Sequence, residues 1–189
     1  MDSRNKAGDL YWEVVETKEV GAYNLFSVNI NRSRSPRTGK EHEFQVLSSP
    51  DWVAVIALTK TNDVILVNQY RHGTSRLSLE LPGGLVKPGQ TPERSAREEL
   101  EEETGFLAPH FECLGSMYPL PALFTNRFHV YFAPNAEPRG TFNPDETEEL
   151  QTILVPAPEI RQYIKSGRID CGIMIAALNY GMEKIDRLF

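Results

Sequence analysis

Apolar and polar residues alternate with a period of two along most of the chain, which is the pattern of half-buried β-strands. Three alternating segments near the N-terminus predict an antiparallel meander, and five later segments predict further strands. Trp52–Leu58 is a continuous apolar run, and with Val64–Tyr70 it is predicted to lie at the centre of a sheet. The other predicted strands are Tyr11–Glu16, Tyr23–Ile30, Glu41–Leu47, Phe111–Gly115, Phe128–Ala133 and Leu150–Val155.

Helical periodicity is found in three segments. The first follows Thr91, a residue type that caps helix N-termini, and stops before Gly105, where a left-handed C-cap is expected. The other two are Ala157–Ser166, ended by Gly167, and Ile173–Lys184. Many strands with few helices predict an α+β fold.

Two loops differ from the rest in composition or length. Asn31–Lys40 is basic and rich in turn residues, and we expect its charges to be solvated. Pro134–Glu148 is a long irregular connection, and loops of that length often carry function.

Length, composition and charge favour a globular protein and argue against membrane and nucleic-acid-binding classes. A chain of 189 residues with 40 % hydrophobic and 24 % charged residues has the size of one globular domain with an appended piece. No apolar run approaches the ~20 residues that cross a bilayer, so no membrane segment is expected. Met1–Leu10 lacks the features of a secretory signal, which predicts a cytoplasmic location. The net charge of −6 argues against a nucleic-acid partner, and Cys113 and Cys171 are expected to be free thiols.

Five glutamates occupy six positions near the C-terminal end of the helix that follows Thr91. They are Glu98, Glu99, Glu101, Glu102 and Glu103. Like charges three and four residues apart cost roughly 0.2–0.5 kcal/mol per pair, and the negative end of the helix dipole adds to this cost. Arg94 and Arg97 can each pair with the acid four residues later. The other three acids then share one face without a basic partner from the helix.

Carboxylates that converge without Cys or His suit a hard cation such as Mg²⁺ or Mn²⁺. The alternative is a solvated face, because runs of charge usually face water. Two glycine-containing turns before the helix, Pro82–Gly84 and Lys87–Gly89, favour the cation. Glycine allows a backbone carbonyl to approach a metal and backbone amides to approach phosphate oxygens.

The stretch Leu81–Phe106 resembles the Nudix box, a loop–helix–loop motif. Its pattern is Gly, five residues, Glu, seven residues, and then Arg-Glu-aliphatic-any-Glu-Glu-any-Gly-aliphatic. The residues in register are Gly84, Glu99, Leu100, Glu102, Glu103, Gly105 and Phe106. Gln90 and Glu98 depart from the motif, which has Glu and Arg at these positions. We expect either that Gln90 donates a hydrogen bond to Glu98, reversing the polarity of the usual pair, or that Arg94 pairs with Glu98.

From Trp12 to Leu178 the chain resembles the branch of this family that contains ADP-ribose and nucleoside diphosphate sugar pyrophosphatases. The resemblance implies a mixed β-sheet sandwiched between helices and preceded by the antiparallel meander. It assigns dimerisation and a contribution to substrate binding to residues 1–48, and the hydrolase domain to residues 49–189.

The same resemblance implies a homodimer that uses Mg²⁺, or Mn²⁺ in its place, to hydrolyse the pyrophosphate of ADP-ribose or another nucleotide sugar. The products would be a nucleoside monophosphate and a sugar phosphate. One alternative is a Nudix enzyme that acts on nucleoside triphosphates, dinucleoside polyphosphates or RNA 5′ ends. Another is a non-catalytic Nudix domain that senses a nucleotide sugar.

The resemblance also implies a metal site. Glu99 and Glu103 would be the principal ligands, and the Gly83 carbonyl would be a further one. Glu102 would act as a ligand or as a catalytic base that orients water. Bound cations are needed because the negative oxygens of a pyrophosphate shield its phosphorus atoms from attack.

Substrate contacts are expected from four residues. Arg71 can clamp two phosphates with its planar fork, although a surface salt bridge is the alternative. Glu80 would bind metal or substrate, or else be a buried acid at a strand end. Trp12 would stack on a nucleobase, with strand packing as the alternative. Pro121 lies where the branch tends to carry a proline downstream of the box.

The resemblance also implies that the general base comes from a loop after a later strand of the domain, which here is the segment Pro144–Leu150 that reads PDETEEL. Glu148 fits best by its distance before Leu150. Glu146 and Glu149 are close competitors, and simple solvation would explain any of the three.

Overall fold

The computed structural model describes residues 10–187, and these fall into two compact units. The first unit contains the described residues up to Pro50 together with Tyr118–Asn126. The second contains Asp51–Met117 and the described residues from Arg127 onwards.

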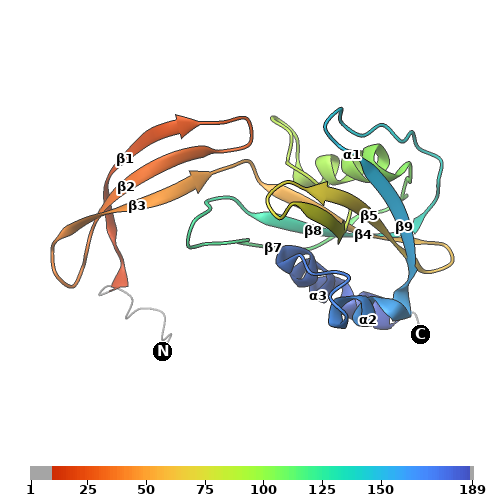
Figure 1. The fold of residues 1–189 in the computed structure, drawn as a ribbon. Coiled ribbons are helices and arrows are strands. Elements are labelled where there is room, and N and C mark those ends of the chain that lie inside the picture. The colour runs from red at the N-terminus through yellow and green to blue at the C-terminus, as the bar shows by residue number, and fades with distance from the viewer. Residues whose placement is uncertain (1–9, 188–189) are drawn as a thin grey trace. The chain divides into compact units, whose positions relative to one another are not determined.

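The first unit is a three-stranded antiparallel sheet with the order β1-β2-β3 (Figure 1). Its strands are β1 (Glu13–Ala22), β2 (Ser27–Arg34) and β3 (Glu41–Ser48). The meander expected from the sequence is therefore confirmed. The segment 118–126 joins this unit through Leu47, whose amide donates to the Leu123 carbonyl at 2.8 Å and whose carbonyl accepts from the Thr125 amide at 3.1 Å.

Strand β2 lies four residues further along the sequence than the predicted strand Tyr23–Ile30 and includes the first part of the predicted loop Asn31–Lys40. Its Arg32 donates to Glu16 on β1 at 2.8 Å, and Arg34 donates to Glu13 on β1 at 2.7 Å and to Glu41 on β3 at 2.9 Å. The expectation that these charges are only solvated was wrong for both arginines. Opposite charges face each other across neighbouring strands, where they stabilise the pairing.

The second unit is built on a mixed sheet with the order β6-β5-β4-β8-β7, and β9 pairs with β5. β4 and β8 run parallel, and the other pairs are antiparallel. The strands are β4 (Trp52–Thr59), β5 (Asp63–Arg71), β6 (Arg76–Glu80), β7 (Glu112–Met117), β8 (Phe128–Ala136) and β9 (Leu150–Pro156). Strand β6 was missed in the sequence because it is a short hairpin partner of β5, five residues long.

Helices cover both faces of this sheet (Figure 1). Helix α1 (Pro92–Thr104) packs with its Ala96 and Leu100 against Val53, Val55 and Ala57 of β4. The alternate β4 residues Ala54, Ile56 and Leu58 pack on the other face, against α3 (Gly172–Asp186). Burial of β4 on both faces explains its continuous apolar sequence. The predicted α+β sandwich is confirmed.

The segment predicted as one helix from Ala157 to Ser166 begins as a 3₁₀ turn, Ala157–Glu159, and continues as α2 (Ile160–Lys165). Within residues 10–187, no helix is both long enough and apolar enough to cross a membrane.

Candidate active site

Helix α1 begins and ends at the residues expected from the sequence. The Thr91 hydroxyl accepts a hydrogen bond from the Arg94 amide at 3.3 Å, and Pro92 is the first helical residue. Gly105 has a φ of 70°, and its amide donates to the Glu101 carbonyl at 2.7 Å. The last turn contains no basic residue, so the acids there meet the negative end of the helix dipole uncompensated by the helix itself.

The long loop between β8 and β9 caps the C-terminal end of α1. The Asn143 amide donates to the Glu102 carbonyl at 2.9 Å, and the Gly140 amide donates to the Gly105 carbonyl at 3.0 Å. The Thr141 amide donates to the Glu101 carboxylate at 3.2 Å. These bonds satisfy carbonyls that a helix end leaves open, and they hold the loop beside the acidic end of the helix.

Glu103 is the most deeply buried acid of the helix, with 2 % of its surface exposed. Its carboxylate accepts a hydrogen bond from the Gly83 amide at 2.8 Å. Burial, with a smaller contribution from the nearby charges of Glu99 and Glu148, raises the pKa of Glu103 to about 9, although this hydrogen bond and the charge of Arg71 oppose the rise. A buried carboxylate in this setting favours either a proton or a cation.

Glu99 lies one turn earlier and faces the glycine loop. Burial raises its pKa to about 7, although the positive charge of Lys87 opposes this. A Cβ atom on Gly84 would stand 2.8 Å from the Glu99 carboxylate carbon, so only glycine leaves this space free. The solvated face considered from the sequence is therefore excluded for Glu99 and Glu103.

Glu98 and Gln90, the two residues that depart from the motif, bond to each other. The Gln90 amide donates to the two Glu98 oxygens at 3.2 and 2.9 Å, and Arg94 donates to Glu98 at 3.0 Å. Both expected arrangements are present together, and these hydrogen bonds lower the pKa of Glu98. The expected pairing of Arg97 with Glu101 was wrong, because Arg97 turns back to Glu93 at 2.9 Å and lies over the Phe111 ring.

Glu102 turns toward the loop rather than toward the two buried acids. Both of its oxygens accept hydrogen bonds from the Lys87 ammonium, at 3.0 and 2.8 Å. Although partial burial disfavours its charged form, the neighbouring acids raise the pKa of Lys87, so it remains an ammonium group.

Arg71 and Glu80 form a bidentate ion pair beside this site. Arg71 donates from Nε at 2.9 Å and from one Nη at 2.7 Å, and it also interacts electrostatically with Glu103. Although burial disfavours the charged form, the bonds from Arg71 lower the pKa of Glu80. The other Nη group makes neither bond, and 45 % of the Arg71 side chain is exposed. The structure thus shows the salt bridge considered for Arg71 and the buried strand-end acid considered for Glu80. Their contacts with substrate stay predictions.

Glu148 is the loop acid that interacts with both buried glutamates, since its charge raises the pKa of Glu99 and of Glu103. It is partly buried, and one of its oxygens accepts from the Asp145 amide at 3.3 Å. Glu146 and Glu149 are exposed. Among the three competitors, only Glu148 has a charge that acts on both helix glutamates, and its role as the base stays a prediction.

Trp12 and Pro121 belong to the first unit. The Trp12 ring packs edge-on against His42 and Phe44, with ring centroids 5.7 and 5.3 Å apart. This is the strand packing considered as the alternative to base stacking. Tyr11 and Pro121 are exposed. The substrate roles of Trp12 and Pro121 stay predictions.

The donor atoms around Glu99 and Glu103 fit a hard divalent cation. The acids supply oxygen ligands, and burial leaves two carboxylates whose charge no adjacent basic side chain pairs directly within the described chain. Two backbone amides of β4, those of Val53 and Val55, donate hydrogen bonds to the carbonyls of Gly84 and Pro82. The residue between these two, Gly83, carries the carbonyl that is expected to be a further metal ligand. Residues 10–187 contain no group of three acids, histidines or cysteines already gathered for an ion, and Glu102 is bonded to Lys87.

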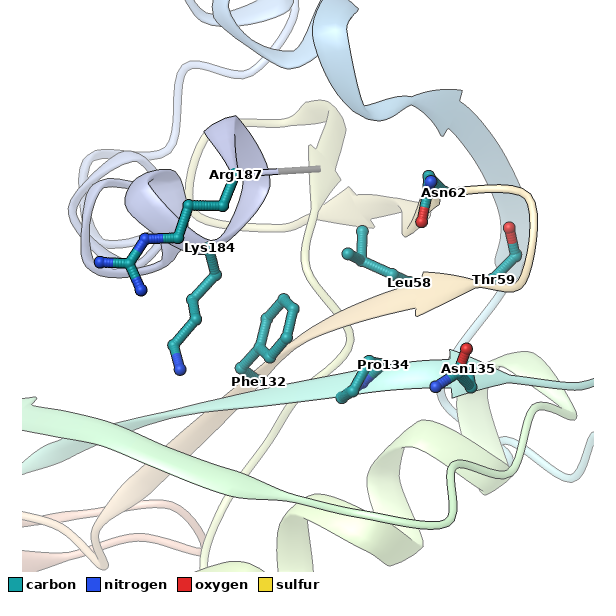
Figure 2. A pocket seen from close by; sticks show the side chains of 8 residues that line it. All are labelled: Leu58, Thr59, Asn62, Phe132, Pro134, Asn135, Lys184 and Arg187. Atoms are coloured by element: carbon teal, nitrogen blue, oxygen red, sulfur yellow. The ribbon is translucent and has the colours of Figure 1, made fainter. Parts of the chain in front are cut away.

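A separate cavity of about 260 Å³ lies on the α3 side of the sheet (Figure 2). Its walls come from the ends of β4 and β8 and from the last turns of α3. The lining residues are Leu58, Thr59, Asn62, Phe132, Pro134, Asn135, Lys184 and Arg187. They include no carboxylate and none of the predicted site residues, so the candidate chemistry lies elsewhere.

Comparison with known proteins agrees with this geometry. Residues 49–170 match the model of the NUDIX domain family. The chain is 29 % identical over 175 residues to a methanol dehydrogenase activator of Bacillus methanolicus, covering 92 % of this chain and 94 % of that protein. It is 31 % identical over 120 residues to an ADP-ribose pyrophosphatase of Bacillus subtilis (strain 168), covering 62 % of this chain and 65 % of that protein.

A solved structure of an ADP compounds hydrolase shares the fold, with a TM-score of 0.82 and 21 % sequence identity. The match covers 94 % of this chain and 95 % of the solved chain. The family match spans the glycine loop, α1 and the loop acids that build the site. The chain therefore belongs to the Nudix domain family.

Proposed function

We propose that the chain is a Mg²⁺-dependent hydrolase that cleaves the pyrophosphate bond of ADP-ribose or another nucleoside diphosphate sugar. The products are a nucleoside monophosphate and a sugar phosphate, and Mn²⁺ substitutes for Mg²⁺. The observation that carries the proposal is the pair of carboxylates set against the glycine loop, of which Glu103 is buried and Glu99 is partly buried. The relative from Bacillus subtilis named above as an ADP-ribose pyrophosphatase supports the choice of substrate.

The proposed metal ligands and the proposed general base come from different segments of the chain. Glu99, Glu103 and the Gly83 carbonyl hold the cation, and Glu102 joins them as a ligand or orients the attacking water. When bound, the cation supplies charge neutralisation at the pyrophosphate and lowers the pKa of water. Glu148, from the loop fixed to the end of α1, accepts the proton of the attacking water.

Arg71 contacts the two phosphates through the part of its guanidinium that Glu80 leaves available. Glu80 in turn fixes the direction of that guanidinium. Trp12 stacks on the nucleobase, and Pro121 lines the substrate-binding surface.

Turnover of a panel of nucleotide sugars with Mg²⁺, with Mn²⁺ and with EDTA tests the proposal. ADP-ribose should be cleaved to AMP and ribose phosphate only when a divalent cation is present. Nucleoside triphosphates, dinucleoside polyphosphates and capped RNA belong in the same panel, and preference for one of them would move the enzyme to another class of substrate. Cation-dependent binding of ADP-ribose without any cleavage would favour a sensing domain.

We also propose that the chain is a cytoplasmic homodimer that assembles through the meander. A small sheet needs a buried apolar face to be stable by itself, and β1 is exposed along almost its whole length. Light scattering should give about twice the 21.4 kDa chain mass. Removal of the residues before Ser49 should give an inactive or insoluble protein, whereas a fully active monomer would refute this assembly.

A further inference from the structure

Lys87 brings a positive charge from the glycine loop to the acidic end of α1. Its ammonium donates to both oxygens of Glu102, at 3.0 and 2.8 Å, and lies 3.4 Å from an oxygen of Glu98. The last turn of the helix has no basic residue of its own. The loop therefore supplies the charge that the helix lacks.

Several hydrogen bonds hold Lys87 at this place. Its backbone amide donates to the hydroxyl of Ser95, which is fully buried, at 3.1 Å. That hydroxyl donates to the Gln90 side chain at 2.8 Å, and Gln90 in turn donates to Glu98. The two residues that depart from the Nudix motif thus belong to the network that fixes Lys87 beside Glu102.

We infer that Lys87 is an internal cation that neutralises Glu102 in the metal-free protein and competes with the divalent cation for that carboxylate. The inference rests on the proposed function, in which the acids of α1 bind a metal. A cation at Glu102 must compete with the Lys87 ammonium, which already donates to both oxygens, and must approach against its charge. Lys87 is a positioning residue in this account, because it acts through Glu102.

Substitution of Lys87 by Gln should therefore have two opposite effects. Mn²⁺ should bind about two- to tenfold more tightly, because the competing partly exposed ion pair and its repulsion are lost. The metal-free protein should melt roughly 1–4 °C lower, because Glu102 loses its partner among like charges. Lys87→Arg should stay close to the wild type in both measurements, because it keeps the charge.

Lys184→Gln is a matched control. Lys184 also donates to both oxygens of a glutamate, Glu112, at 2.7 Å each, and the exposure of the two pairs is similar: 38 and 36 % for Lys87 and Glu102, 34 and 43 % for Lys184 and Glu112. Its loss should lower the melting temperature without changing Mn²⁺ affinity. Lys87→Met keeps most of the alkyl stem and repeats the test if Lys87→Gln folds poorly.

Mn²⁺ titration of the metal-free full chain, with thermal melts in EDTA, separates the outcomes. Absence of Mn²⁺ binding by the wild type would overturn the proposed metal site. If the wild type binds Mn²⁺ and Lys87→Gln binds it equally or more weakly, the inference about Lys87 is overturned and the metal site stands. In a Glu102→Gln background, Lys87→Gln should lower the melting temperature in EDTA by less, because only the longer contact of Lys87 with Glu98 remains to be lost. An undiminished effect there would also contradict the inference.

Discussion

Replacement of Glu103 by Gln should stabilise the metal-free protein while it removes the metal site. Glu103 is 2 % exposed, and burial raises its pKa from an ordinary value of 4.5 to about 9. The unfolded chain releases the proton above pH 4.5, whereas the folded chain retains it up to about pH 9. The free energy of unfolding therefore falls as pH rises between these two values, in the absence of metal.

The size of this effect follows from the shift. At about 1.4 kcal/mol for each pH unit above 4.5, retaining the proton on Glu103 costs about 3 kcal/mol at pH 7 and less than about 1 kcal/mol at pH 5. Gln is neutral at every pH, has nearly the same shape, and its carbonyl oxygen can accept the hydrogen bond from Gly83. The variant should gain most of that difference, which for a chain of 189 residues corresponds to about 6–12 °C in melting temperature at pH 7.

Thermal melts in EDTA at pH 5, 7 and 8 measure the gain. It should grow with pH, and Mg²⁺ should stabilise the wild type at pH 8 far more than it stabilises Glu103→Gln. Glu101→Gln is the control, because it removes a charge from the same helix and its amide oxygen can still accept from Thr141. Its effect should be small and nearly independent of pH. If Glu103→Gln lowers stability by the same amount at pH 5 and pH 8, then burial does not set the ionisation of Glu103.

Further predictions concern the loop acid and the glycines. Glu148→Gln should leave Mn²⁺ affinity nearly unchanged in a titration and reduce turnover by ~10²–10⁴, whereas Glu146→Gln should retain turnover in the same assay. Gly84→Ala should fold normally by thermal melting and bind Mn²⁺ more weakly, because its Cβ displaces the mobile carboxylate of Glu99, 2.8 Å away. Gly83→Ala should unfold at a much lower temperature, because its Cβ would lie 2.1 Å from a backbone carbonyl oxygen of β4, which cannot move aside.

Local signals in the sequence were sufficient to predict α1 and most of the strands. Thr91, Pro92 and Gly105 fix the helix ends through backbone hydrogen bonds and φ, which depend on a few neighbouring residues. The continuous apolar run of β4 reflects burial on two faces, which its residue types report directly. Strand β6 carries no such signal, because five residues at a hairpin end show too little periodicity.

The partners of individual charges were less predictable than the elements that carry them. Arg97 has acids four residues away on both sides, and it pairs with Glu93 while its guanidinium lies over the Phe111 ring, a contact that helical spacing does not reveal. Lys87 precedes the helix by several residues, so helical spacing does not reveal its bond to Glu102. Arg32 and Arg34 were assigned to a loop because strand register, which brings Glu16 and Glu41 opposite them, is not visible in a single segment.

At the C-terminal end of α1, the acids that are proposed to bind the metal lower the stability of the metal-free fold. The buried Glu103 and the partly buried Glu99, both with raised pKa, cost folding free energy at neutral pH, and no basic residue in the last turn reduces that cost. The helix nevertheless persists, because the Thr91 cap and the fully buried Ala96 and Leu100 fix it to the sheet by interactions independent of the acids. The carboxylates that lower the stability of the metal-free protein are the same groups that are proposed to bind the cation, and cation binding would restore that stability. Glu103→Gln should therefore raise metal-free stability and lower metal affinity through one side chain.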